Sequence, residues 1–256
     1  MEKRDDGAEK RTVTGRVVAL LDAVAALGEH ATLAALTRAT GIPKPTVRRI
    51  AGDLVIRGML ERIDDGYRLG RHLLALGVRA AEQHGLRDAA TPHVQDIFAR
   101  TREVVWFSAL SDASFVLLDS AFGSNRAEDL RRRRWPSAVR SDLFLASAAG
   151  RIVLADRPEL LERVRKRPLA RLTCRTPATW HQLSEVLHRV RNQNVAMEQD
   201  ESVLGYSCVA TGVRDPGGKL IGMIGVTGRT GGFDPTRLRR PLLAAADDIS
   251  RVIASR

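Results

Sequence analysis

The sequence predicts an α+β chain in which an N-terminal winged helix-turn-helix is joined by a linker helix to a second domain with a mostly antiparallel sheet. Three observations predict this fold class. Residues 31–69 have the pattern of two short helices and a small hairpin, and residues 71–86 form a helical segment rich in leucine and alanine. From Val104 onward, short apolar runs typical of strands replace the helical spacing. A length of 256 residues leaves room for two modest domains.

The first domain is expected over residues 14–70. An apolar helix at residues 15–28 precedes a short helix that ends at Thr40-Gly41, and a second helix opens at Pro45. Glycine supplies the backbone angles of the intervening turn, and proline is tolerated in a first helical turn, where its missing N–H costs nothing. Two short alternating segments around the Asp-Gly turn at residues 64–66 indicate a hairpin, the wing.

The second helix of the pair has two contrasting faces. The apolar residues that share one face are Val47, Ile50, Leu54 and Val55. Thr46, Arg48 and Arg49 fall on the other face, in the N-terminal half, where a recognition helix places its contacts with bases and phosphates. An ordinary helix pair with solvated arginines is the alternative, and the adjoining hairpin favours the DNA-binding interpretation. The candidate DNA-binding residues are Lys44, Pro45, Thr46, Arg48, Arg49 and Arg68.

Composition agrees with a polyanionic partner. The formal net charge is +11 and the isoelectric point is about 10.8, which favours nucleic acid, although arginine far outnumbers lysine and a general bias toward arginine would have the same effect. Cys174 and Cys208 form no C-x-x-C pair, so neither a disulfide framework nor a zinc site is expected. No apolar run approaches the length of a membrane span, and residues 1–13 read as a charged, disordered arm. A cytoplasmic protein without a cofactor or metal is expected.

The second domain is expected over residues 87–256, after a linker helix at residues 71–86. Its predicted helices cover residues 86–101, 146–155 and 177–192, the last with Thr176 as cap, and a final helix that starts at Asp234-Pro235 and reaches residue 255. Its predicted strands cover residues 104–109, 115–120, 207–213 and 220–227. Helices outside hairpin-connected strands are typical of an α+β sensor-like domain.

In the N-terminal half, the motifs LAALTRATGIPKPTVRRI and GYRLGRHLLALG resemble the IclR-type bacterial transcriptional regulators. The segments TREVVWFSALSDASFVLLDS, ASAAGRIVLA and NVAMEQDESVLGYSCVATGV extend this resemblance to nearly the whole chain. The resemblance implies a winged helix-turn-helix joined by a helix to a GAF-like effector-binding domain. It also implies a homodimer or dimer of dimers that regulates transcription, often in the catabolism of organic or aromatic acids.

The same resemblance implies an effector pocket. Its candidate residues are Ala148, Ala149, Gly150, Glu198 and Cys208. Amides at the start of a helix attract a carboxylate through their unsatisfied donors and the helix dipole. Glu198 could accept a hydrogen bond from a ligand hydroxyl, although a surface carboxylate and a core cysteine are the alternatives for Glu198 and Cys208.

The sequence departs from the family pattern at several positions. Pro45 replaces the usual serine before the recognition-helix threonine, which removes one hydroxyl contact with phosphate, Glu198 replaces the usual aspartate, and Gly212 replaces a proline. Residues 143–147 read Leu-Phe-Leu-Ala-Ser where the family tends to have Pro-Leu-His-Ala-Thr. A larger hydrophobic or aromatic effector is therefore expected, with loss of effector sensing as the alternative.

Two recognition helices of a dimer would enter successive major grooves of an operator, about 34–36 Å apart. An enzyme with an accessory helical domain is the rival interpretation, but the sequence has no G-x-S-x-G, P-loop or dinucleotide motif. A ligand-independent architectural DNA-binding protein is a second rival, for which the long second half has no explanation. Arg131–Arg134 is expected to be a solvated loop, with a second nucleic-acid patch or pairing with an acidic effector as alternatives.

Overall fold

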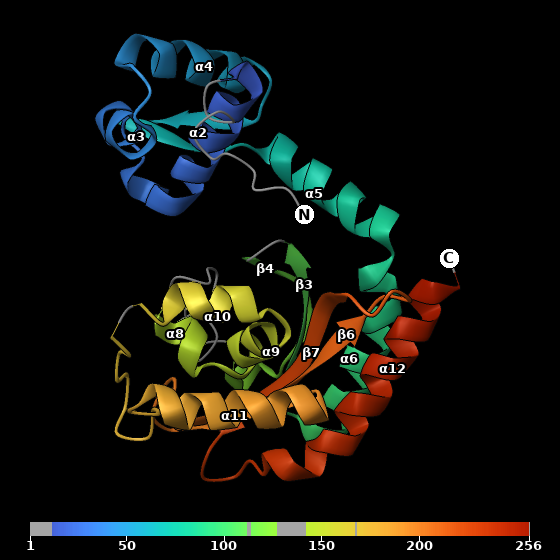
Figure 1. The fold of residues 1–256 in the computed structure, drawn as a ribbon. Coiled ribbons are helices and arrows are strands. Elements are labelled where there is room, and N and C mark those ends of the chain that lie inside the picture. The colour runs from blue at the N-terminus through green and yellow to red at the C-terminus, as the bar shows by residue number, and fades with distance from the viewer. Residues whose placement is uncertain (1–11, 112–113, 127–141, 167, 256) are drawn as a thin grey trace. The chain divides into compact units, whose positions relative to one another are not determined.

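The chain divides into two compact units, one ending at Gln83 and the other beginning at His84 (Figure 1). The computed structural model describes residues 12–111, 114–126, 142–166 and 168–255. Residues 1–11 of the predicted N-terminal arm and the arginine run at 131–134 lie outside the described residues. The last two residues assigned to that arm were predicted wrongly, because Thr12 caps the first helix and Val13 begins it. Each unit has its own buried apolar core, so each is described by itself.

The N-terminal unit is the predicted winged helix-turn-helix. Its elements are α2 (Val13–Leu27), η1 (Gly28–His30), α3 (Leu33–Thr40), α4 (Lys44–Ile56), β1 (Leu60–Ile63), β2 (Gly66–Leu69) and α5 (Arg71–His84). Thr12 and Thr32 cap α2 and α3, since each side-chain oxygen accepts a backbone N–H of the first turn. Gly41 ends α3 in the left-handed conformation (φ 69°), as the predicted turn requires.

The wing is fastened to the helices by a close backbone contact. Gly66 pairs with Thr32 in an isolated bridge, and the Tyr67 amide donates to the Ala31 carbonyl at 3.1 Å. A Cβ on Gly66 would lie 2.7 Å from the Ala31 oxygen, so only glycine permits this approach. The hairpin therefore packs against the segment between α2 and α3, which fixes its position relative to the helices of this unit.

The C-terminal unit is a sheet covered on both faces by helices. Its elements are α6 (Leu86–Thr101), β3 (Val104–Ser111), β4 (Ser114–Ala121), η2 (Ser124–Arg126), α8 (Asp142–Ala146), α9 (Ala148–Asp156), α10 (Pro158–Val164), α11 (Trp180–Gln193), β5 (Val195–Gln199), β6 (Tyr206–Arg214), β7 (Leu220–Arg229), η3 (Pro235–Leu238) and α12 (Arg239–Ala254). The described strands run in the order β4-β3-β7-β6-β5, with every neighbouring pair antiparallel.

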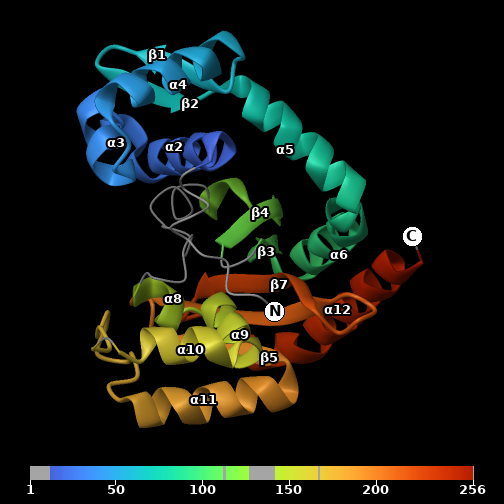
Figure 2. The same ribbon diagram turned by 45° about the horizontal axis from the view of Figure 1, so that its top comes forward.

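Two apolar clusters lie on opposite faces of this sheet. The first contains side chains of α8, α9, α10 and α11, and the second contains side chains of α6 and α12. Figure 2 shows the same division, with α8 to α11 on one side of the strands and α6 and α12 on the other. Strand side chains alternate between the two clusters, so a residue's place in its strand determines which helices it meets.

Several predicted boundaries in this unit were wrong. Helix α11 begins at Trp180 with Thr179 as its cap, whereas Thr176 was predicted; the Thr176 hydroxyl instead donates to the Glu201 carbonyl at 2.7 Å. Strand β5 and the short helices α8 and α10 were not predicted. The final helix is preceded by the short 3₁₀ turn η3, which Asp234 caps.

Candidate DNA interface and effector site

Helix α4 presents a basic face opposite its buried face. Its buried residues are Val47, Ile50, Ala51 and Leu54. Arg48 and Arg49 are exposed, Lys44 is exposed at the first position, and Thr46 is half-buried. Arg49 lies 3.7 Å from Asp53, an exposed pair that costs little to separate when a phosphate arrives. The predicted contacts of the recognition helix thus share one accessible surface.

The start of α4 has few backbone donors. The helix begins at Lys44, one residue before the predicted start, and its N-cap is Pro43. Of the first four positions, where amides have no acceptor within the helix, Pro43 and Pro45 have no N–H at all. Only the amides of Lys44 and Thr46 remain as backbone donors at this end, so a phosphate there would have to be bound chiefly by side chains.

Arg68, one of the predicted DNA-binding residues, is paired across the wing. Its Nε donates to Glu61 Oε2 at 2.8 Å, and its second guanidinium nitrogen lies 2.6 Å from the same oxygen. Arg71 lies 3.8 Å from the other oxygen. Arg68 would have to share its guanidinium between Glu61 and a phosphate.

Because of this pairing, we expect the stability of the wing to depend on pH. The hydrogen bond from Arg68 holds the pKa of Glu61 below its ordinary value of 4.5. Because the folded-state pKa is lowered, the stabilisation is complete above 4.5 and is lost as the pH falls through the lowered pKa. We expect Arg68→Ala to raise the Glu61 pKa in an NMR titration, and to lower the melting temperature less as the pH falls below 4.5. An unchanged Glu61 pKa in this variant would contradict the assignment, and Glu61→Gln is the control that removes the titrating group.

The N-terminus of α9 contains the three small residues predicted for the effector site. Ala148, Ala149 and Gly150 are all buried. Ser147 caps the helix, with its Oγ accepting the Gly150 amide at 3.0 Å, while the first two helical amides, those of Ala148 and Ala149, have no acceptor within the helix. A Cβ at Gly150 would lie 1.8 Å from the Phe144 carbonyl oxygen, so Gly150 is explained by the close approach of α8.

A row of polar side chains crosses the sheet on the face that α9 covers. Glu198 on β5 is in register with Cys208 on β6, and Cys208 is in register with Thr227 on β7. Cys208 belongs to the same apolar cluster as Ala148 and Ala149. All three side chains are buried, and the Thr227 hydroxyl donates to Cys208 Sγ at 3.3 Å. Glu198 is only 2 % exposed, which excludes the alternative of a surface carboxylate.

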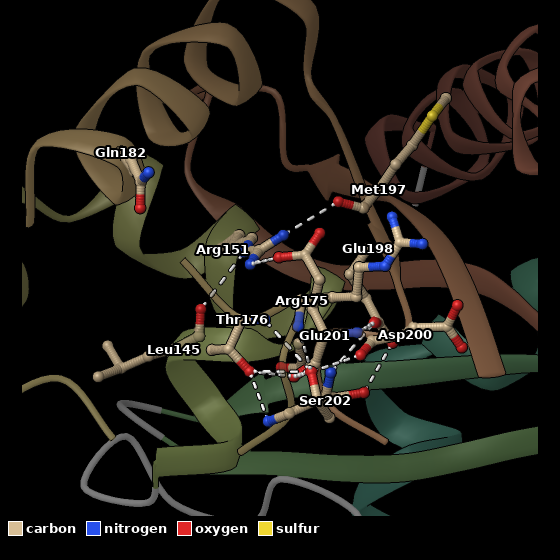
Figure 3. A network of polar contacts seen from close by, with 12 residues as sticks. Leu145, Arg151, Arg175, Thr176, Gln182, Met197, Glu198, Asp200, Glu201 and Ser202 are labelled. Atoms are coloured by element: carbon tan, nitrogen blue, oxygen red, sulfur yellow. Dashed lines mark hydrogen bonds and ion pairs between the residues drawn. The ribbon is translucent and has the colours of Figure 1, made fainter. Parts of the chain in front are cut away.

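The Glu198 carboxylate is bound to the loop between β5 and β6. It accepts the amides of Glu201 at 3.1 Å and Ser202 at 3.3 Å, and the Ser202 hydroxyl donates to Glu198 Oε1 at 2.7 Å. Figure 3 shows these contacts below Arg151. A ligand hydroxyl at this carboxylate would therefore compete with the hydroxyl of Ser202.

A buried arginine joins α9 to the same loop. Arg151 is completely buried; it donates to the Leu145 carbonyl at 3.3 Å and to the Met197 carbonyl at 3.1 Å, and it pairs with the Glu201 carboxylate (Figure 3). Sequence reasoning missed both Arg151 and Thr227. An arginine within the apolar run of residues 146–155 was the available signal for Arg151, whereas Thr227 is placed only by the register of three strands.

A helix-turn-helix unit with an accessible basic helix face, joined to a separate α+β unit, is the architecture of a DNA-binding transcriptional regulator. The family model described as the bacterial transcriptional regulator IclR C-terminal domain matches residues 78–251, and the IclR helix-turn-helix domain matches residues 13–64. The chain belongs to the IclR family, as its motifs predicted.

Relatives and solved structures agree with this assignment. The chain is 26% identical over 215 residues to the glycerol operon regulatory protein of Streptomyces griseus, covering 83% of each chain. It is 30% identical over 195 residues to the HTH-type transcriptional regulator TtgV of Pseudomonas putida, covering 73% of this chain and 71% of that one. An IclR homologue of Microbacterium hydrocarbonoxydans, solved in complex with 4-hydroxybenzoate, has a TM-score of 0.74 at 22% identity and covers 96% of this chain and 100% of its own.

Proposed function

We propose that the protein is an operator-binding regulator that works as a homodimer in the cytoplasm, with α4 as its recognition helix. The observation that carries this proposal is the accessible basic face of α4, with Lys44, Arg48 and Arg49 opposite a fully apolar face. Leu74 and Val78 on α5 are 70% and 43% exposed and lie one helical turn apart on the same face, and this apolar surface fits contact with a second copy. Among the described residues, none of the helices has the length and apolarity needed to cross a membrane.

We propose further that the effector is an aromatic acid held between the α9 N-terminus and the polar row. The ligand carboxylate would accept hydrogen bonds from the Ala148 and Ala149 amides. It would not lie at the opposite end of the site, because the buried Glu198 carboxylate there repels a second anion. A ligand hydroxyl would replace that of Ser202 on Glu198. Phe144, stacked on Phe115 with ring centroids 5.3 Å apart, supplies aromatic surface in the same cluster. The hydroxybenzoate complex of the Microbacterium homologue supports this ligand class.

The effector acts by binding two arrangements of the DNA-binding units with different affinity. Helix α5 connects the two units in the chain and is the segment through which the difference passes. An enzymatic activity is not proposed, because the family is one of transcriptional regulators.

One experiment tests both the DNA interface and the effector site. Genomic DNA fragments bound by the protein are selected, and 4-hydroxybenzoate is then titrated against the complex with the selected fragment. We expect specific, strongly salt-dependent binding that 4-hydroxybenzoate changes, whereas benzyl alcohol, which has no carboxylate, does not. Glu198→Gln should weaken the response to 4-hydroxybenzoate more than that to benzoate. Equal affinity for all fragments would contradict the regulator proposal, and an operator complex indifferent to aromatic acids would contradict the effector proposal.

Pro45 provides a second test of the interface. Pro45→Ser restores both an amide and a hydroxyl at the start of α4, so we expect operator affinity to rise by about three- to tenfold, from about one neutral hydrogen bond. Pro45→Ala restores the amide alone and should give part of this gain. Fluorescence anisotropy with the selected operator measures both variants. Unchanged affinity in both would show that no phosphate approaches this end of the helix.

A further inference from the structure

Trp106 lies beside the proposed effector site but is not used by it. It is on β3, 2 % exposed, and belongs to the apolar cluster that includes Ala148, Ala149 and Cys208. Its register partner on the neighbouring strand β7 is Gly225, two residues before Thr227. Residues two apart in a strand share a face, so Trp106, Gly225 and Thr227 all lie on the side of the sheet that α9 covers.

The indole lies directly over Gly225. A Cβ at this glycine would come within 2.3 Å of Trp106 Cζ2 and 2.7 Å of Cε2, both rigid ring atoms. The absence of a side chain at Gly225 thus lets the ring lie against the strand. Any side chain there would push the ring away from the sheet, toward the α9 side.

The indole is also linked by hydrogen bonds to the polar row. Trp106 Nε1 donates to Thr227 Oγ1 at 3.2 Å, and that hydroxyl donates to Cys208 Sγ at 3.3 Å. Sulfur is a weak acceptor. An oxygen acceptor of a bound ligand could therefore take the Thr227 hydrogen bond from Cys208 while the indole continues to hold the hydroxyl in place.

We propose that the indole of Trp106 determines the size of the effector that the site admits. This inference rests on the proposed effector site and adds to it a residue that selects among aromatic acids. The ring fills buried apolar space next to Cys208 and Thr227, so removing it leaves a cavity that a larger apolar ligand can occupy. On this proposal the site accepts a single-ring acid beside the indole and excludes a fused two-ring acid.

The test compares benzoate with 2-naphthoate by calorimetry in the full-length protein. Wild-type protein should prefer benzoate, and Trp106→Ala should shift the ratio of affinities toward 2-naphthoate by at least about tenfold. Trp180→Ala is the matched control, because Trp180 packs against the same cluster from the start of α11; it should leave the ratio unchanged. Trp106→Leu, with a smaller reduction in volume, provides the same comparison if the alanine variant does not fold.

Gly225→Ala tests the same inference in the opposite direction. The added Cβ pushes the indole into the site, so benzoate affinity should fall, and adding Trp106→Ala should restore it. An unchanged ratio in both Trp106 variants, with benzoate still bound, would overturn this inference and leave the effector site standing. Failure of wild-type protein and every variant to bind either acid would contradict the effector site and this inference together.

Discussion

Replacing Arg48 and Arg49 together with alanine is expected to weaken operator binding by about a hundredfold or more. Each specific arginine contact contributes about 1–3 kcal/mol, and both side chains project from the exposed face of α4. An arginine that neutralises a phosphate also releases counterions, so the slope of log affinity against log salt should become shallower by about 0.9 for each phosphate that the variant no longer neutralises. Fluorescence anisotropy at several salt concentrations measures both quantities.

A charge-matched control separates specific contacts from overall attraction. Arg163 on α10 and Arg189 on α11 are exposed, so Arg163→Ala/Arg189→Ala removes the same charge from the unit that does not contain α4. This pair should change operator affinity only slightly, and both double variants should keep the oligomeric state of the wild-type protein. Equal decreases in affinity in the two double variants would show that net charge, and not α4, accounts for binding.

The N-terminal unit was predictable because its signals are local. The threonine-glycine end of α3 and the apolar face of α4 each specify a structure within a few residues. The wing was also predicted, but the predicted Asp-Gly turn was wrong in detail: Asp64 and Asp65 form the loop, and Gly66 is already the first residue of β2, paired with Ile63. What was not predictable there is the bridge of Gly66 to Thr32, which depends on the packing of segments far apart in the sequence.

In the C-terminal unit the errors have identifiable causes. Thr176-Pro177 resembles a helix start, but Thr179 and Gln182 form a capping box, a signal present in the sequence that was overlooked. Strand β5 follows α11 almost directly and has the sequence VAMEQ, with one β-branched residue, so its pairing with β6 rather than its own propensity makes it a strand.

The proposed effector site could be predicted only in part for the same reason. Family resemblance indicated Glu198 and Cys208, and strand register then places them side by side. Thr227 and Trp106 join them across two further strand pairs, and no local pattern specifies that register. Gly150 was predicted as part of a ligand site, and its close approach to the Phe144 carbonyl gives it a packing role that needs no ligand.

The second large expected effect is the decrease in stability when Arg151 is removed. Arg151→Ala leaves two backbone carbonyls, those of Leu145 and Met197, without their buried donor and leaves the Glu201 carboxylate without its cation. Breaking a buried ion pair by deleting one partner costs about 3–5 kcal/mol. The Glu201 side chain is 19% exposed, so water recovers part of its solvation and the lower end of this range is expected.

Urea unfolding followed by tryptophan fluorescence measures this decrease in the C-terminal unit. That unit begins at His84 and contains all three tryptophans of the chain, Trp106, Trp135 and Trp180. Arg100→Ala is the control: its pair with Asp96 spans 2.9 Å but both side chains are more than half exposed, so removing it should cost less than about 1 kcal/mol. The double variant Arg151→Met/Glu201→Gln removes both charges and keeps much of the packing, so it should be more stable than Arg151→Ala. If Arg151→Ala unfolds at the same urea concentration as Arg100→Ala, the buried pair does not hold the β5–β6 loop against α9. The stability of that loop, and with it the position of Glu198, would then have to come from the hydrogen bonds of Thr173 and Thr176 to its backbone.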